Sequence, residues 1–229
     1  MKVKTLSLFK NFTKFEWFLW VFSLTLVTVA FLLPENKDYL NLASSIIGVT
    51  ALVFMAKGHY LGLILCIIFS ILYAIVSLIF GYYGEAITYG LMTLPMTVIE
   101  LIAWLKHPYK ETEEVEISSL NAKKVVVCLV LTAIVTVAFY FVLSAFATKN
   151  LIVSTISVAT SFIACAFSFL RSPFYAFCYA LNDIVLIILW ISASFSSLAY
   201  LSVVTCFSVF LLNDGYAFFN WMRMKNKQN

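Results

Sequence analysis

Charged side chains are scarce in this chain. Asp, Glu, Lys and Arg make up 11% of its 229 residues, whereas soluble globular domains carry about 25%. Hydrophobic residues make up 63%, and the mean hydropathy is +0.99. A soluble protein of this size could not bury that much apolar surface, so lipid must solvate part of it. The composition therefore indicates a polytopic membrane protein and excludes a soluble domain.

The residues and motifs on which most enzymes rely are also scarce. His59 and His107 are the only two histidines, so a histidine-based metal site or nucleophile triad has no basis. The chain has no P-loop, which excludes ATP-driven pumping by the chain itself. Its five cysteines lie in apolar runs without Cys-x-x-Cys spacing, which favours packing roles. We therefore expect no catalytic residue, no metal and no cofactor.

Long apolar runs are abundant. A helix of about 20 residues crosses the roughly 30 Å hydrocarbon core of a bilayer, and these runs are too long and too apolar for barrel strands. The first run is longer than a signal-peptide core and lacks a small-residue cleavage motif, so we expect it to be retained. The fold class is therefore all-α, with eight transmembrane helices near 15–33, 39–56, 60–80, 86–105, 124–146, 151–170, 173–193 and 198–221.

Basic residues divide unevenly between the two sides that eight spans create. Thirteen of the 15 Lys and Arg residues, including Lys2, Lys4 and Lys10, fall on one side, and only Lys37 and Lys149 fall on the other. The positive-inside rule places the basic side, and with it both termini, in the cytoplasm. Since topology explains the net charge of +4, no nucleic-acid partner is indicated.

The second half of the chain retraces the first at an offset of 114 residues, which aligns Lys57 with Arg171 and Glu100 with Asp214. Each half supplies three spans, in the blocks 39–105 and 151–222. Three helices end on the face opposite their start, so a parallel duplicate needs one extra crossing. The sequence therefore predicts a 3+1+3 core with a pseudo-two-fold axis along the membrane normal.

The remaining segments frame these two blocks. Residues 1–38 hold the cytoplasmic N-terminus and the extra first helix, and residues 223–229 form a cytoplasmic tail. Residues 106–150 hold the connector helix and the longest loop, 106–123. That loop carries an acidic run typical of a solvated linker, made of Glu111, Glu113, Glu114 and Glu116. No extramembrane domain is expected, so the helices must build the function.

Charges inside spans are costly and mark function by default. Glu100, Asp183 and Asp214 stand well inside, whereas Glu85 lies near an outer helix end where it could reach water. Glu16 is expected at the inner membrane interface. Polar residues in spans also join helices, at roughly 0.6–2 kcal/mol each, so every candidate has a packing alternative.

The last two spans carry the richest set of polar candidates. On a 3.6-residue period Asp183 and Trp190 share a face, with Asn182 beside it. A carboxylate, an amide and an aromatic ring on one stripe suit a nucleoside-sized solute. Asn213 and Asp214 are candidates on the eighth span. Asn220 and Trp221, nearer the interface, are interpreted there as anchors.

The fourth span adds a second polar stripe. Thr93, Thr97 and Glu100 recur at i, i+4 and i+7, with Tyr89 four residues earlier. Pro95 removes a backbone donor and predicts a kink in this helix. A polar stripe on a kinked span favours a transport pathway over simple helix packing.

These features resemble the PnuC nicotinamide riboside transporters, bacterial relatives of the SWEET sugar carriers. The likeness covers about residues 40–222 and lies in three stretches: residues 78–85 running to Trp104, Asn182 followed by Trp190, and residues 200–221 around Asn213 and Asp214. It is nearest to Gram-positive forms, through residues 93–96 and 182–185. The resemblance implies a multi-pass protein of the bacterial inner membrane.

The resemblance also implies a mechanism. Nicotinamide riboside would cross by facilitated diffusion, with binding near the midplane and rocking of the two blocks. A separate kinase would trap it inside by phosphorylation. Tyr89 and Thr97 stand where many relatives carry Gln and Asn, so another vitamin or nucleoside (thiamine, riboflavin or a deoxynucleoside) stays open as substrate.

Other interpretations remain at this stage. The buried carboxylates could bind a pyridinium cation or couple protons. An unrelated intramembrane enzyme would need clustered His or Asp residues at a membrane face, and a structural or receptor subunit would move no solute. Small residues such as Gly48 and Gly62 could mediate contacts within a chain or in a homo-oligomer.

Overall fold

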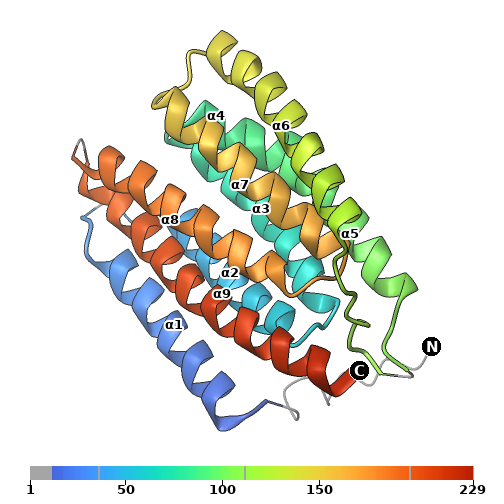
Figure 1. The fold of residues 1–229 in the computed structure, drawn as a ribbon. Coiled ribbons are helices and arrows are strands. Elements are labelled where there is room, and N and C mark those ends of the chain that lie inside the picture. Colours follow the sequence, from blue (N-terminus) through green and yellow to red (C-terminus); the bar gives the residue numbers. More distant parts are fainter. Residues whose placement is uncertain (1–11, 36, 111, 196, 229) are drawn as a thin grey trace.

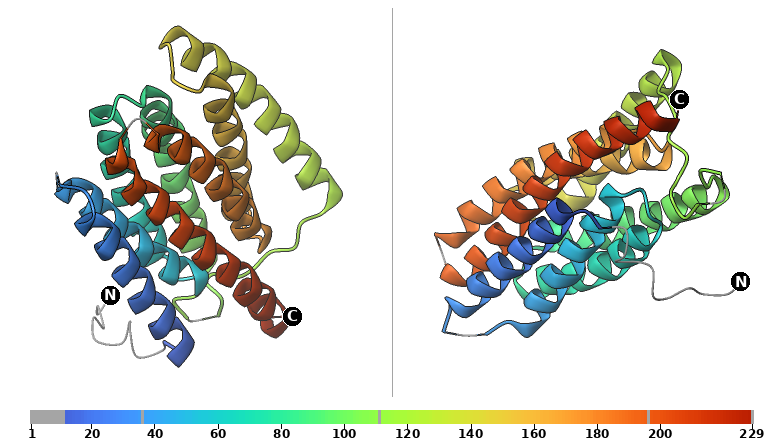
Figure 2. Two further views of the ribbon diagram at one scale, coloured as in Figure 1. Left: turned by 90° about the vertical axis from the view of Figure 1, so that its left-hand side faces the viewer. Right: turned by 90° about the horizontal axis from the view of Figure 1, so that it is seen from below.

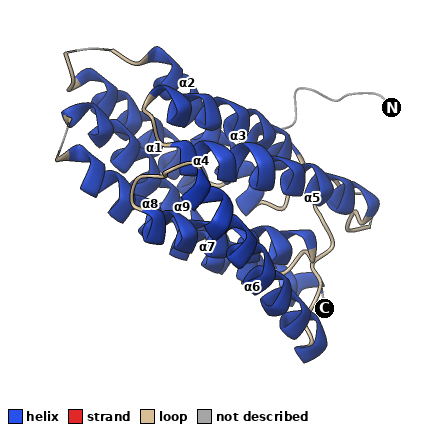
Figure 3. Ribbon diagram, turned by 90° about the horizontal axis from the view of Figure 1, so that it is seen from above, coloured by secondary structure: helices blue, strands red, loops and turns tan. Residues whose placement is uncertain are grey.

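The computed structural model describes residues 12–228 except 36, 111 and 196, and over these ranges it consists of helices and loops without a strand (Figures 1 and 3). Lys2, Lys4, Lys10 and Glu111, assigned above to the cytoplasmic side, lie outside the described residues. The membrane-length helices in the described part number eight: α1 (Lys14–Leu32), α2 (Tyr39–Ala56), α3 (Leu61–Ile79), a composite helix (Tyr83–Lys106), α6 (Ala122–Ala145), α7 (Leu151–Phe169), α8 (Phe174–Ser194) and α9 (Leu201–Gln228). The predicted all-α class with eight spans is confirmed.

The fourth and eighth spans differ most from their predicted form. The fourth consists of α4 (Tyr83–Ile87), a π-helical segment η1 (Thr88–Thr93) and α5 (Leu94–Lys106). A short 3₁₀ turn, η2 (Leu198–Tyr200), precedes α9. Helix α9 then continues to Gln228, so most of the predicted tail forms its last turns.

The two blocks pack against each other reciprocally. Helix α2 contacts α9, and α5 contacts α7, so the first helix of each block lies on the third helix of the other. Figures 1 and 2 show α1 at one edge of the bundle, against α2 and α9, and α6 at the other edge, against α7. This reciprocal contact is what a parallel duplication requires, and the duplication itself stays a prediction.

The start of α1 and the end of α9 lie at the same end of the bundle, here called the terminal end (Figure 1). The described basic residues gather there, whereas Lys37 and Lys149 lie in connections at the opposite end. Helix α2 begins at the opposite end with Asp38, whose side chain accepts a hydrogen bond from the Asn41 N–H. Such caps satisfy donors that the helix itself cannot.

Glu16 lies at the terminal end, as predicted, but its side chain is buried between helices. Its side chain is 2% exposed and accepts hydrogen bonds from Lys57 Nζ at 3.0 and 3.1 Å and from Tyr216 Oη at 2.9 Å. Glu16 also completes a capping box with Thr13 at the start of α1. The Lys57 ammonium group balances the charge of this buried carboxylate, which would otherwise be costly to remove from water. The pair joins α1, α2 and α9.

The loop between the blocks is docked rather than free. Its backbone donates from Val115 N to Gly58 O at 2.9 Å and from Ser118 N to Arg171 O at 3.0 Å. Val115 is buried, and the Ile117 N–H donates to the Gln228 side chain. The loop therefore bonds the α2–α3 turn, the α7–α8 turn and the end of α9.

The acidic side chains of this loop still face water. Glu113 and Glu116 are 57% and 59% exposed, and they pair with His59 at 3.0 Å and Arg171 at 3.6 Å. The loop was predicted to be a solvated linker. Its carboxylate groups are indeed exposed, but its backbone is hydrogen-bonded to the helix bundle. Exposed pairs of this kind contribute little stability, about 0–1 kcal/mol each.

Replacing Lys57 tests the buried ion pair. Lys57→Met should lower the free energy of unfolding by about 3 kcal/mol or more, because it leaves the Glu16 carboxylate buried without its cation. The double variant Glu16→Gln/Lys57→Met should recover most of the loss, since a neutral amide needs no counter-charge. Thermal unfolding in detergent micelles measures both. A double variant as unstable as Lys57→Met would contradict this account.

Candidate functional site

A cavity of about 50 Å³ lies between the two blocks. Its walls come from α2, α3, η1 and α5 on one side and from α8 and α9 on the other. The residues that line it are Gly48, Leu52, Met55, Cys66, Phe69, Ser70, Tyr89, Thr93, Thr97, Tyr179, Asn182, Asp183, Phe210 and Asp214.

Six of the nine residues proposed from the sequence meet at this cavity: Tyr89, Thr93, Thr97, Asn182, Asp183 and Asp214. Sequence reasoning missed the α3 wall, which Cys66, Phe69 and Ser70 form. Little in the sequence indicated this wall, because α3 carries no charged residue. Its buried Ser70 and Ser77 were the available sign of a polar inner face.

Asp183 and Asp214 are the only charged-type side chains among the described residues that line the cavity, and they face each other from α8 and α9. They are 3% and 2% exposed. Asp183 Oδ2 has no hydrogen-bond partner in the described part of the chain. Two buried carboxyl groups in contact do not both ionise readily, because like charges repel strongly at low dielectric. The pair therefore keeps at least one proton and presents at most one negative charge to the cavity.

Asn182 is held in one orientation beside this pair. Its Oδ1 accepts hydrogen bonds from Thr160 Oγ1 at 2.8 Å and from Ser161 Oγ at 2.9 Å, both on α7. The amide group faces the Tyr89 hydroxyl across the blocks. An amide with its oxygen already engaged offers its N–H groups to oxygen atoms in the cavity.

The π-helical segment brings the fourth span to the cavity. Leu94 N donates to Tyr89 O, five residues back, and Pro95 follows directly with no N–H of its own. The predicted disturbance at Pro95 is thus a widened turn that ends just before it. Thr97 Oγ1 donates to Thr93 O at 2.8 Å. Widened turns of this kind occur often at functional sites.

Gly48 lets α2 approach the cavity closely. A Cβ atom at this position would collide with the rings of Phe210 and Phe69, which line the cavity from α9 and α3. The absent side chain therefore keeps the two blocks in contact through aromatic rings.

The structure places Trp190 and Asn213 outside the cavity. Trp190 is fully buried and donates from Nε1 to Tyr73 Oη at 2.8 Å, among Tyr82 and Tyr200 towards the opposite end. Asn213 donates to Ser23 Oγ at 3.0 Å and so joins α9 to α1. Helical periodicity identifies residues that share a face, but tertiary packing decides which face meets the cavity.

Two further carboxyl groups lie in the bundle away from the cavity. Glu100 is fully buried, has no hydrogen-bond partner in the described part, and faces Ser168 and Cys165 on α7. Glu85 is also fully buried, and Ser157 donates to it at 3.5 Å. The prediction that Glu85 reaches water is therefore wrong. Unpaired carboxyl groups in such surroundings are expected to be neutral.

The cavity is closed at the terminal end by hydrogen bonds onto the last turn of α2. Met55 O accepts from Trp221 Nε1 at 2.8 Å and from Tyr175 Oη at 3.2 Å, and Ala56 O accepts from Asn220 Nδ2 at 2.9 Å. We call this set the terminal closure. It corrects the prediction that Trp221 is an interfacial anchor, because this side chain is fully buried.

Aromatic rings close the cavity at the other end. Tyr73 contacts Tyr89 on the cavity side and Trp190 on the outer side, and Tyr82 and Tyr200 cover Trp190. We call this set the opposite closure. Pockets for small molecules are roughly 300–1,000 Å³, so a cavity of about 50 Å³ must widen to hold one.

Comparisons with known proteins agree with this architecture. The family model described as nicotinamide mononucleotide transporter matches residues 38–223. The chain is 25% identical to a protein of Neisseria mucosa named nicotinamide riboside transporter PnuC, over 97% of this chain and 86% of that one. A crystal structure of the vitamin B3 transporter PnuC superposes with a TM-score of 0.85 at 24% identity, covering 97% of both chains. The last likeness shows that the fold is shared.

The Tyr73–Trp190 hydrogen bond can be tested by a double-mutant cycle. Trp190→Phe should lower the free energy of unfolding by about 1–3 kcal/mol, because it leaves the buried Tyr73 hydroxyl without its donor. The double variant Trp190→Phe/Tyr73→Phe should lose less stability than the sum of the two single variants, by about 1 kcal/mol. Denaturant unfolding in micelles gives the four values. Strict additivity would show that the two side chains are not coupled.

Proposed function

The chain belongs to the nicotinamide mononucleotide transporter family, and we propose that it carries nicotinamide riboside across the membrane by alternating access. The name of the Neisseria mucosa relative supports this choice of substrate. The observation that carries it is the cavity itself, which is lined by two aspartates and, within the described residues, by no Lys or Arg.

The charge of the cavity separates two related solutes. Nicotinamide riboside carries one positive charge on its pyridinium ring, and its ribose is neutral. Nicotinamide mononucleotide adds a phosphate, which needs Arg, Lys or helix N-termini as partners. A bound pyridinium cation favours ionisation of one carboxyl group of the Asp183–Asp214 pair, whereas a phosphate beside the pair is repelled. The riboside is therefore the better fit, although the family is described by the mononucleotide.

Neutral groups of the cavity would hold the rest of the solute. Asn182 and Thr93 can bond to ribose hydroxyls or to the carboxamide, and the Tyr89 ring offers a face to the pyridinium cation. Thr93 Oγ1 is buried and has no hydrogen-bond partner in the described part. Thr97 lines the same wall of the cavity, one helical turn after Thr93.

Transport would alternate between the two closures. Opening the terminal closure frees the cavity on one side, and separating Trp190 from Tyr73 frees it on the other. Rocking of the two blocks provides this motion. Because no ATP-binding motif is present in the sequence, we propose passive uniport, with a separate kinase trapping the riboside by phosphorylation.

The basic terminal end supports one orientation of the protein in the membrane. We place it, with both chain termini, in the cytoplasm of a bacterial inner membrane, because Lys and Arg concentrate there. The outer faces of α1 and α6 are largely exposed and apolar, which suits contact with lipid tails. A homo-oligomer would have to form through such outer faces in place of lipid.

A binding titration tests the substrate. Purified protein should bind nicotinamide riboside at least about tenfold more tightly than nicotinamide mononucleotide, because the carboxyl pair repels a phosphate. Thiamine, which is also a cation, and riboflavin, which is neutral, serve as comparison ligands in isothermal titration calorimetry. Equal or tighter binding of the mononucleotide would overturn the assignment.

Asp214→Asn tests the origin of the preference. It should weaken binding of the riboside about tenfold or more, equivalent to about 1.4 kcal/mol, and weaken its uncharged reduced form much less. Glu100→Gln is the matched control: it lies at the repeat-equivalent position, is equally buried, and does not line the cavity. Its affinity for nicotinamide riboside should stay within about twofold of that of the unmodified protein. If both variants lose affinity equally, the carboxyl pair is not the recognition element.

A further inference from the structure

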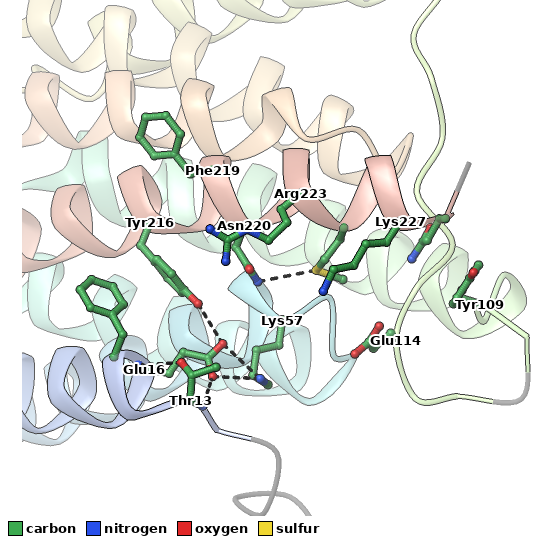
Figure 4. A pocket seen from close by; sticks show the side chains of 13 residues that line it. Thr13, Glu16, Lys57, Tyr109, Glu114, Tyr216, Phe219, Asn220, Arg223 and Lys227 are labelled. Carbon is green, nitrogen blue, oxygen red and sulfur yellow. Dashed lines mark hydrogen bonds and ion pairs between the residues drawn. The ribbon is translucent and has the colours of Figure 1, made fainter.

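A second and larger cavity opens at the terminal end, apart from the cavity between the two blocks. It measures about 750 Å³ and lies between the start of α1, the α2–α3 turn, the loop between the blocks and the last turns of α9 (Figure 4). It shares no lining residue with the cavity between the blocks. Its size is that of a ligand site.

Two cations of this cavity are not neutralised by a carboxylate among the described residues. Arg223 and Lys227 lie one turn apart on α9, are exposed, and form no hydrogen bond or ion pair within the described residues. Figure 4 shows Lys227 extending from α9 towards Lys57 and Glu114, and Arg223 lying beside Asn220. Cations four residues apart on a helix share a face, so one anion can meet both.

The carboxylates of the cavity do not cancel this charge. Glu16 is already compensated by Lys57 and by the Tyr216 hydroxyl. Glu114 is exposed on the loop, across the opening from α9. The α9 side therefore keeps an unbalanced positive charge.

The border of the cavity is apolar. Phe15 on α1 and Phe219 on α9 line it and are 54% and 72% exposed. Both rings lie in the membrane-length helices, next to the basic side chains at the terminal end. In a bilayer, basic side chains next to exposed aromatic rings at a helix end lie where lipid headgroups meet acyl chains. The cavity has this arrangement.

We propose that this cavity binds the phosphate headgroup of an anionic phospholipid. The phosphate lies between Arg223 and Lys227, and the acyl chains run along Phe15 and Phe219. A soluble phosphate ester has the same charge but would leave both rings unused, which is why the lipid is favoured. The bound lipid bridges the extra helix α1 and the last helix of the second block.

The test uses the full chain in an uncharged detergent, with bound lipid counted by native mass spectrometry. Phosphatidylglycerol is titrated into the unmodified protein, into the double variant Arg223→Gln/Lys227→Gln, and into Lys225→Gln. Lys225 lies on α9 between the two cations but does not line the cavity, so it is a matched control for charge. Phosphatidylcholine and glycerol 3-phosphate are titrated in parallel, and the melting temperature in the same uncharged detergent checks that each variant is folded.

The unmodified protein and Lys225→Gln should bind phosphatidylglycerol equally. The double variant should lose about 25-fold in affinity, since each basic residue near an anionic lipid contributes a factor of about five. Glycerol 3-phosphate should not displace the lipid at equal concentration. Three results would overturn the proposal: phosphatidylcholine binding as tightly as phosphatidylglycerol, a loss in Lys225→Gln equal to that of the double variant, or an unaffected double variant. Displacement by glycerol 3-phosphate would identify a site for soluble phosphate esters instead.

Discussion

The last turn of α2 has carbonyl oxygens that no residue of its own helix can reach, and the terminal half of the molecule depends on how they are satisfied. In a membrane such carbonyls need protein partners. Met55 O accepts the Gly58 N–H of the following turn and also donors from α8 and α9, and Ala56 O accepts a donor from α9. Gly58 O, in the turn after α2, accepts the backbone N–H of Val115. The second block and the connecting loop are thus bonded to the first block through main-chain atoms, which side-chain substitution in α2 cannot remove.

The two closures differ in kind. At the terminal end, several hydrogen bonds end on one helical turn, and the buried Glu16–Lys57 pair lies close by. At the opposite end, the closure consists of aromatic rings in contact and one hydrogen bond between Trp190 and Tyr73. Ring contacts can slide, whereas directional bonds to carbonyls are made or broken. The polar end therefore suits a switch between two discrete states.

Hydropathy was sufficient to predict the class of the fold and the bounds of the spans to within a few residues, except that the eighth span continues past 221 to Gln228. The family resemblance, carried by residues such as Asn182 and Asp214, is confirmed by the match over residues 38–223. The rotation of each helix was not predictable. In lipid both the outer and the inner faces of a helix are apolar, so Trp190 and Asn213 could not be assigned to a face from spacing alone. The Glu16–Lys57 pair and the docked loop were missed because their partners lie far away in sequence.

The loop between the blocks bonds both the α2–α3 turn and the α7–α8 turn, through Val115 and Ser118. These two bonds are only three residues apart on the loop. A peptide segment of three residues spans at most about 11 Å when fully extended. While both bonds hold, the Gly58 and Arg171 carbonyl oxygens cannot move apart beyond that reach plus the two hydrogen bonds of 2.9 and 3.0 Å, so the loop would limit how far the two turns separate in the proposed cycle. Its length would then set how far the terminal end opens, independently of how tightly the cavity binds its solute.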